Sequence, residues 1–532
     1  MPSRQESTML HTSNVPRCII IALLCVAASV RAGDLDVIGV TLLRQFDPSL
    51  LGDGVHVAHV EPPVFSNALP PFQVDPSAVG QPASLFTYIS ELGTANTFTN
   101  TVGIASFHAN LVGGNFYGAT NGPAPQVSGV GNYEAGFFFS NIISAASRPN
   151  IAGRVVNQSF IFEPSEADMA DQHYDDYAHE RNVLFVSGVG NAGPVNSPGT
   201  CYNGLGAALY GAPSSVGPAP DGRSKPDITA PNRAQAPGSA NSYSVPYVSG
   251  CAALLLQAAL RGDGGTNTNA AADIRTIKAL LMNGAVKPAD WTNGLATPLD
   301  ARYGSGIVNI FNSWQQLLGG QHSFIQSTTM PGGEAHPPGS SPNNVPALVG
   351  WDHNSISTLA DQDRVHHYYF NVPGTDSRVF AATLVWHRHS GEATINNLDL
   401  FLYNAVSGHL VLCSTSLIDN VEHIFVPRLP PGRYDLQVLK TGPGQVTGTE
   451  TYSLAFAFVS PPELAISATD EFVRIAWPVF PDGWILQSSP SLNSAGSWTT
   501  VNAPVTVDTN LAENLVLLPP GATSQFFRLR RP

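Results

Sequence analysis

A serine followed four residues later by a proline is the pattern in this chain that points most directly to chemistry. Residues 240–250 read ANSYSVPYVSG, and small and apolar residues continue to Leu256. Small residues at helical spacing let a helix pack closely into a core, so we expect Ser242 at the start of a buried helix. The free N–H groups there favour negative charge near the Ser242 oxygen. Pro246 within that helix would cost about 3 kcal/mol or more, which favours a geometry imposed by a site. An ordinary buried helix capped by serine is the alternative.

Three further segments carry the groups that a serine nucleophile needs. They are GDGVHVAHVE at 52–61, HANLVGG at 108–114 and VLFVSGVGNAG at 183–193. A serine hydroxyl is a poor nucleophile at neutral pH without a base within hydrogen-bond reach. His108 can accept and return a proton, because its unperturbed pKa is about 6.5. Glu61 carries a carboxylate, which can hold an imidazole in one tautomer. Asn191 carries an amide, which can donate to a developing oxyanion.

Two of these assignments have alternatives in the sequence itself. Glutamate is one methylene longer than aspartate, and Pro62 and Pro63 follow Glu61 directly. The orienting acid could therefore be a neighbour such as Asp53, or the site could be degraded. Asn191 stands among glycines and could be a turn residue that tolerates positive φ.

Taken together, these segments resemble the subtilisin-like serine proteases. The family's nucleophile segment reads G-T-S-x-A-x-P-H-V-A-G, and aligning the proline and the last glycine places its serine on Ser242. Its catalytic histidine falls on His108 and its oxyanion asparagine on Asn191, whereas its aspartate is replaced by Glu61. The segment VVNQSF at 155–160 resembles the family's substrate-flanking strand and suggests Ser159 for substrate binding. The order acid, histidine, asparagine, serine is that of subtilisin, and the resemblance spans roughly residues 50–315.

The resemblance implies a serine endopeptidase that hydrolyses polypeptides by acyl transfer, with no cofactor required for the chemistry and no catalytic metal. The alternative is a catalytically inactive subtilisin-like fold that serves as a binding or surface-display protein. It rests on the departures from the family pattern: Glu61 itself, AN in place of G-T before Ser242 and after His108, and too few residues between the leader and Asp53 for the usual propeptide domain.

The N-terminus has the pattern of a secretory signal peptide. Arginines precede the apolar run CIIIALLCVAA at 18–28, which is too short to span a membrane as a helix. We expect cleavage after Ala32 and a secreted or extracytoplasmic protein.

The formal net charge is -14, and removing a leader with three Arg and one Glu leaves about -16. The chain has no basic stripe, which argues against nucleic-acid or anionic-membrane partners. A monomer is expected.

Cysteine usage excludes a disulfide scaffold. After loss of the leader only Cys201, Cys251 and Cys413 remain, without a Cys-x-x-Cys spacing. Cys251 lies among small residues and is best explained as a buried hydrophobic side chain.

Patterning predicts an α/β fold with a parallel sheet flanked by helices (subtilisin-like), followed by two all-β domains. The predicted boundaries are 1–32 signal peptide, 33–318 catalytic domain, 319–345 linker, 346–460 jelly-roll β-sandwich and 461–532 small Ig-like β module. In the first domain, strands at 55–60, 154–159 and 183–187 alternate with helices at 166–181, 243–261 and 272–283. Beyond the linker, strands are expected at 364–372, 378–387, 398–403, 423–426, 433–438 and 452–458. Carboxylate and amide oxygens at 396–400 and 419–423 make a structural Ca²⁺ conceivable, with polar turn residues as the alternative.

Overall fold

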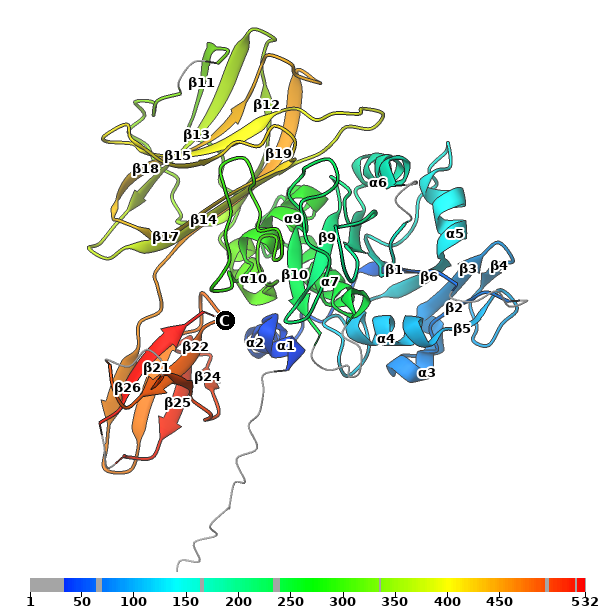
Figure 1. Cartoon of the computed structure of the whole chain (residues 1–532), viewed down its shortest axis with the longest axis horizontal. Coiled ribbons are helices and arrows are strands. Elements are labelled where there is room, and N and C mark those ends of the chain that lie inside the picture. The colour runs from blue at the N-terminus through cyan, green and yellow to red at the C-terminus, as the bar shows by residue number, and fades with distance from the viewer. Residues whose placement is uncertain are drawn as a thin grey trace, which may run out of the picture. The chain divides into compact units, whose positions relative to one another are not determined.

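The strand that ends on Glu61 lies in the middle of a mostly parallel sheet. The computed structural model describes residues 33–63, 69–162, 167–232, 240–333, 336–492, 497–521 and 524–531. Within these ranges the sheet has eight strands in the order β10-β9-β8-β7-β1-β6-β3-β4. Their bounds are β1 His56–Glu61, β3 Phe86–Ser90, β4 Gly93–Ala95, β6 Gly129–Glu134, β7 Val155–Gln158, β8 Leu184–Gly188, β9 Leu205–Tyr210 and β10 Ile228–Pro231. All neighbours are parallel except β4, which pairs with β3 antiparallel (Figure 1).

Both neighbours of β1 hold it in a fixed register. Glu61 is opposite Glu134 on β6, and Val60 is opposite Gln158 on β7. From Val57 onward every residue of β1 is buried, as expected for a parallel strand covered on both faces. The backbone at Glu61 is therefore fixed from two sides.

Helices and short helical turns cover the sheet and supply His108 and Ser242. They are α1 Asp34–Val37, α2 Val40–Phe46, α3 Pro76–Val79, α4 Phe107–Phe116, α5 Ala135–Phe138, α6 Ala167–Arg181, α7 Val245–Arg261, α8 Thr268–Ala271, α9 Ile274–Asn283 and α10 Ile310–Leu318. A 3₁₀ turn (η1, Ala83–Leu85), a π-helical turn (η2, Phe139–Ile143) and a second 3₁₀ turn (η4, Asn241–Tyr243) complete the set, and β2 (Pro71–Gln73) pairs with β5 (Ile104–Ala105).

The helix predicted from Tyr243 begins two residues later, at Val245, which changes the interpretation of Pro246. Pro246 lies in the first turn of α7, where its missing N–H has no intrahelical partner to lose. The proline therefore imposes no strain, and our inference from its cost was wrong. Close packing of α7 is confirmed, because a Cβ on Gly250 would lie 2.7 Å from the Pro123 ring.

The apolar character of α7 reflects burial in the core. By length and composition, Asn241–Arg261 could cross a membrane, but 89% of its apolar window is buried inside the protein. Cys251 on this helix is fully buried, as predicted.

The strands after α10 pair antiparallel in two sheets. One sheet has the order β11-β13-β18-β15-β16 and the other β12-β19-β14-β17. The bounds are β11 Gln326–Pro331, β12 Val349–Ser357, β13 Gln362–Val372, β14 Arg378–Trp386, β15 Leu398–Asn404, β16 Leu410–Ser414, β17 Val421–Leu429, β18 Gly432–Lys440 and β19 Thr449–Val459. Their facing side chains form one apolar core. β11 lies inside the segment expected as a linker and pairs with β13.

A smaller pair of antiparallel sheets follows. The strands are β20 Ala465–Ala468, β21 Val473–Pro478, β22 Ile485–Ser489, β23 Thr499–Thr500, β24 Thr506–Asp508, β25 Glu513–Leu518 and β26 Phe526–Arg530. Ile475, Trp477, Leu486 and Val516 form their core. The predicted signal peptide and its cleavage site lie outside the described residues.

Candidate active site

The predicted site residues gather at the carboxyl edge of the parallel sheet. Glu61 ends β1, Ser159 directly follows β7, and Asn191 lies three residues beyond β8. Parallel strands all end at the same edge, so residues far apart in the sequence meet there, which is where ligands bind in open α/β sheets. His108 and Ser242 reach the same region from α4 and η4, which pack against each other.

Glu61 and His108 form the shortest contact of the group. Glu61 Oε1 lies 2.5 Å from His108 Nδ1. The carboxylate is fully buried, while the imidazole is 25% exposed. His108 is the second residue of α4, whose start is capped by Ser106 accepting a hydrogen bond from the backbone N–H of Ala109. An imidazole that donates Nδ1–H to this carboxylate keeps Nε2 as its basic nitrogen.

Burial and charge act in opposite directions on this pair. Burial alone would raise the pKa of the Glu61 carboxyl, but hydrogen bonds from His108 and His59 bring it below its ordinary value. Burial lowers the pKa of His108, yet the hydrogen bond to Glu61 and its negative charge raise it above the ordinary value overall. The arrangement thus favours an ionised carboxylate beside an imidazole that binds a proton readily.

Ser242 lies in a turn that is braced by Ser159. The Ser242 hydroxyl donates to the Ser159 carbonyl at 3.2 Å, and the Ser159 hydroxyl donates to the Ser242 carbonyl at 2.9 Å. Asn157 donates to the Ser159 hydroxyl and accepts from Ser249 on α7. The buried Ser159 side chain thus contacts the nucleophile turn, and its role in substrate binding stays a prediction.

The base and the nucleophile are neighbours without a direct hydrogen bond. The ring of Tyr243, next to Ser242, lies 5.6 Å from the His108 ring, centroid to centroid. Between His108 and Ser242, both of which the structure describes, no hydrogen bond forms. Such contacts are commonly loose before substrate binds.

Asn191 is exposed beside the same turn. Its Oδ1 accepts the backbone N–H of Asn241 at 2.7 Å. This bond fixes the orientation of the amide, so Nδ2 is the group left to donate. A ligand oxygen near Ser242 could use it together with the backbone N–H of the turn.

The alternative acid, Asp53, lies at the other end of β1. It is exposed in the turn before His56, whereas Glu61 is the last residue of the strand. At about 3.3 Å per residue the two ends of this strand are well over 10 Å apart. The geometry therefore leaves Glu61, rather than Asp53, beside the imidazole.

Sequence reasoning missed two residues of the site. His59 is buried, and its Nε2 lies 3.4 Å from Glu61 Oε2, while its Nδ1 lies 2.9 Å from the Tyr117 hydroxyl. The signal for His59 was the two-residue period of a strand, which directs it to the same face as Glu61. Tyr117 has no comparable signal, because only the packing of α4 brings it to β1.

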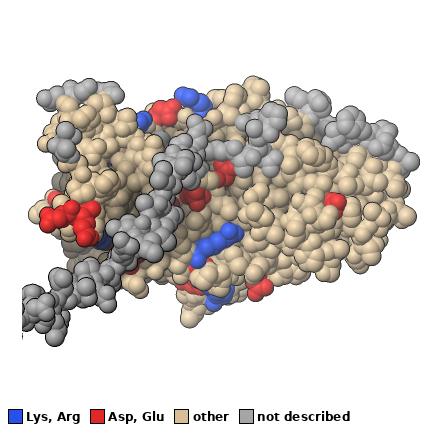
Figure 2. All heavy atoms as spheres, turned by 90° about the horizontal axis from the view of Figure 1, so that it is seen from below, with Lys and Arg blue, Asp and Glu red and all other residues tan. Residues whose placement is uncertain are grey.

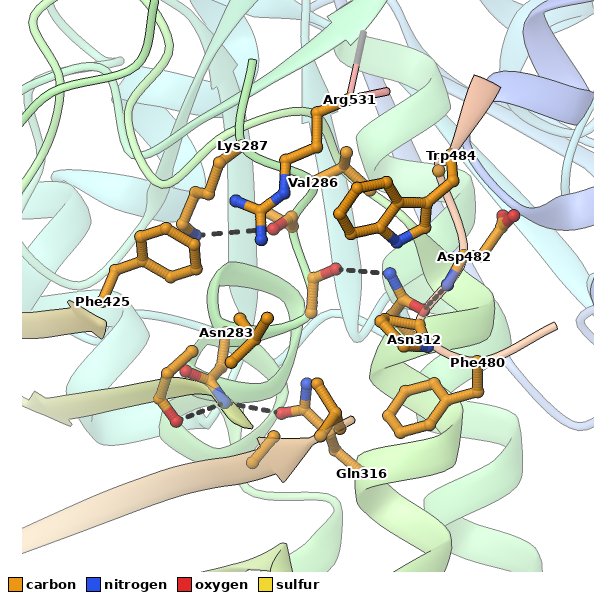
Figure 3. Close-up of a pocket in the computed structure, with 18 residues that line it drawn as sticks. Asn283, Val286, Lys287, Asn312, Gln316, Phe425, Phe480, Asp482, Trp484 and Arg531 are labelled. Carbon is orange, nitrogen blue, oxygen red and sulfur yellow. Dashed lines mark hydrogen bonds between the residues drawn. The ribbon is translucent and has the colours of Figure 1, made fainter. Parts of the chain in front are cut away.

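A cavity of about 70 Å³ lies elsewhere, and none of the five predicted residues lines it. Figure 3 shows its polar and aromatic lining, with Lys287, Phe425, Trp484 and Arg531 around one part of it. It therefore does not contain the proposed catalytic groups.

On the face shown in Figure 2, charged side chains are few and both signs are scattered, in keeping with 12% charged residues.

Comparisons with known proteins give a family for the central part of the chain. Residues 99–306 match the model of the Subtilase family. His108, Ser159, Asn191 and Ser242 lie inside the matched range, and Glu61 lies before it. No curated protein matches the chain significantly.

Similar solved structures include two proteases. The Aeromonas sobria serine protease, in complex with its chaperone, has a TM-score of 0.33 and 13% identity, covering 77% of this chain and 89% of that one. Tripeptidyl peptidase 2 has a TM-score of 0.32 and 12% identity, covering 83% of this chain and 53% of that one. The match of residues 99–306 to the Subtilase family model supports a serine-type peptidase.

Proposed function

We propose that the protein is a secreted serine endopeptidase with Ser242 as nucleophile, His108 as general base and acid, Glu61 as orienting acid, and Asn191 as oxyanion donor. The observation that carries the proposal is the 2.5 Å contact between Glu61 Oε1 and His108 Nδ1. It joins the glutamate that replaces the family's aspartate to the histidine that the family requires as base. A degraded site would have no reason to keep a buried carboxylate on this nitrogen.

The reaction follows from what each group can do. A rotation of the Ser242 side chain away from the Ser159 carbonyl would bring its hydroxyl toward His108, which takes the proton as the oxygen attacks a peptide carbonyl. Glu61 stabilises the imidazolium that results. Asn191 Nδ2 and the backbone N–H of Ser242 receive the oxyanion, and His108 then protonates the leaving amine. Water repeats the sequence on the acyl-enzyme.

Labelling with a fluorophosphonate probe tests the proposal directly. The parent chain should be labelled and should hydrolyse a casein substrate, whereas Ser242→Ala should do neither while keeping its thermal unfolding midpoint. Ser244→Ala is the matched control, because Ser244 lies two residues away but is buried against Ala208 and Asn241; it should still be labelled. A parent that is neither labelled nor active would favour the inactive, binding-protein alternative.

The remaining expectations stay proposals with their own tests. N-terminal sequencing of secreted protein should begin at Gly33 if the leader is cleaved after Ala32, and light scattering tests the monomer. We propose a jelly-roll fold for the strands between 326 and 459, and an Ig-like stabilising module for those after 465. An experimental structure would decide both assignments.

A structural calcium ion near Asn397 and Asp399 is the last of these proposals. Asn397 Oδ1 and Asp399 Oδ1 are buried without a hydrogen-bond partner, so these two oxygens suit a hard cation. In contrast, Asp419 accepts from the backbone of Ser224 and from Ser416. Among the described residues no group of three or more His, Cys, Asp or Glu side chains could hold a metal ion. Calcium titration of the Asp399→Ala variant against the parent, followed by thermal unfolding, tests it.

A further inference from the structure

The carboxylate of Glu61 contacts two imidazoles rather than one. Its Oε1 meets His108 Nδ1 at 2.5 Å, and its Oε2 meets His59 Nε2 at 3.4 Å. Both Glu61 and His59 are 0% exposed. Each carboxylate oxygen therefore has its own imidazole partner from a different element, α4 on one side and β1 on the other.

Tyr117 and Glu61 together determine which nitrogen of His59 carries the proton. Tyr117, directly after α4, is fully buried, and its hydroxyl lies 2.9 Å from His59 Nδ1. If the hydroxyl donates to Nδ1, then a neutral His59 carries its hydrogen on Nε2 and donates it to Glu61. The opposite tautomer would direct the Nε2 lone pair at a carboxylate, which can only accept when ionised. Of the two neutral tautomers, only the Nε2–H form satisfies all three groups.

A glutamate in this position needs a second donor more than an aspartate would. Its extra methylene adds one rotatable bond, so a single hydrogen bond at Oε1 would leave the carboxylate free to turn about that contact. A donor at Oε2 removes this freedom and satisfies an oxygen that is buried away from water. Hydrogen bonds from His108 and His59 also offset burial in lowering the pKa of Glu61.

We propose that His59, held as its Nε2–H tautomer by Tyr117, is a positioning residue that fixes the Glu61 carboxylate against His108. The catalytic effect of His59 rests on the proposed function of the Ser242 site. The hydrogen bonds and tautomer proposed for Glu61, His59 and Tyr117 do not depend on that function.

Two substitutions of similar polarity separate donation from bulk. In His59→Gln the amide nitrogen falls near the position of Nε2 and can still donate to Glu61. In His59→Asn the amide reaches only the position of Nδ1, so Tyr117 keeps a partner while Glu61 loses its donor. We expect His59→Asn to lower kcat about 10- to 100-fold, by analogy with the loss of a partner that orients a metal-binding histidine, with KM unchanged. His59→Gln should retain most of the activity.

A double-mutant cycle shows whether His59 acts through Glu61. In a Glu61→Gln background, His59→Asn should cause no further loss, because the group that His59 positions has already lost its charge. A merely structural role would give the same factor in both backgrounds and would overturn the proposal. Equal loss in His59→Gln and His59→Asn would overturn it as well.

Nuclear magnetic resonance of ¹⁵N-histidine-labelled protein decides the geometry without any activity. The parent should show His59 as the neutral Nε2–H tautomer and a low-field proton for His108 Nδ1–H. His59→Asn, unlike His59→Gln, should broaden the His108 proton. An Nδ1–H tautomer or an imidazolium at His59 in the parent would refute the assignment. If the parent is not labelled by fluorophosphonate, the proposed function fails, and these spectra still decide whether His59 positions Glu61.

Discussion

Replacing Glu61 by aspartate tests how strictly the site depends on the reach of its acid. The change restores the family residue but removes one methylene, and a C–C bond is about 1.5 Å long. The carboxylate oxygen now 2.5 Å from His108 Nδ1 would then lie near 4 Å, beyond hydrogen-bond distance. The backbone cannot advance to compensate, because β6 and β7 pair with β1 on both sides as far as Glu61 and Val60.

A misplacement of about 1 Å can cost about 10²-fold in rate, which corresponds to about 2.7 kcal/mol in the barrier. We therefore expect Glu61→Asp to lower kcat by at least about 10²-fold with little change in KM. Steady-state hydrolysis of a fluorogenic peptide, with active sites titrated by a fluorophosphonate, measures this. Glu61→Gln shows how low kcat falls when the carboxylate is lost altogether. We expect a loss of about 10⁴-fold, because an amide favours the wrong tautomer of His108. Equal or faster turnover in Glu61→Asp would refute the reasoning from reach.

Three further outcomes follow from the same geometry. Burial lowers the pKa of His108, but the hydrogen bond and charge of Glu61 raise it overall. The value of kcat/KM should therefore fall with decreasing pH through a midpoint above 6.5, and Glu61→Gln should move that midpoint to lower pH. A midpoint below 6.5 in the parent would contradict this. Asn191→Ala should lower kcat about 10²- to 10³-fold with a modest effect on KM, whereas an effect confined to KM would make Asn191 a binding or turn residue. Asp227→Ala should destabilise the fold by about 3–5 kcal/mol in urea unfolding, because Lys225 and Lys278 are buried on this carboxylate; a loss below about 1 kcal/mol would show that the lysines find other partners.

The sequence predicted elements best where one local pattern dominates. The strands at 55–60 and 183–187 appear as β1 and β8, within a residue at each end, and the helix expected at 272–283 appears as α9. Strands with many Gly or Ala residues, such as β9, and those with alternating polar residues, such as β12, were missed. They form because neighbouring strands supply their hydrogen-bond partners, which no local pattern shows.

The resemblance of four segments to the subtilisin-like pattern was enough to nominate Glu61, His108, Asn191 and Ser242, and each chemical role admits few side chains. The sequence favoured Glu61 as the acid but left Asp53 as an alternative. That choice depends on which end of β1 faces α4, and the direction of the strand within the sheet decides it. His59 and Tyr117 likewise acquire their positions only through packing, because hydrogen bonds between buried side chains form between elements that are distant in the chain. The residue types set which chemistry is available, and the parallel sheet, which brings all its strand ends to one edge, decides which of those residues meet.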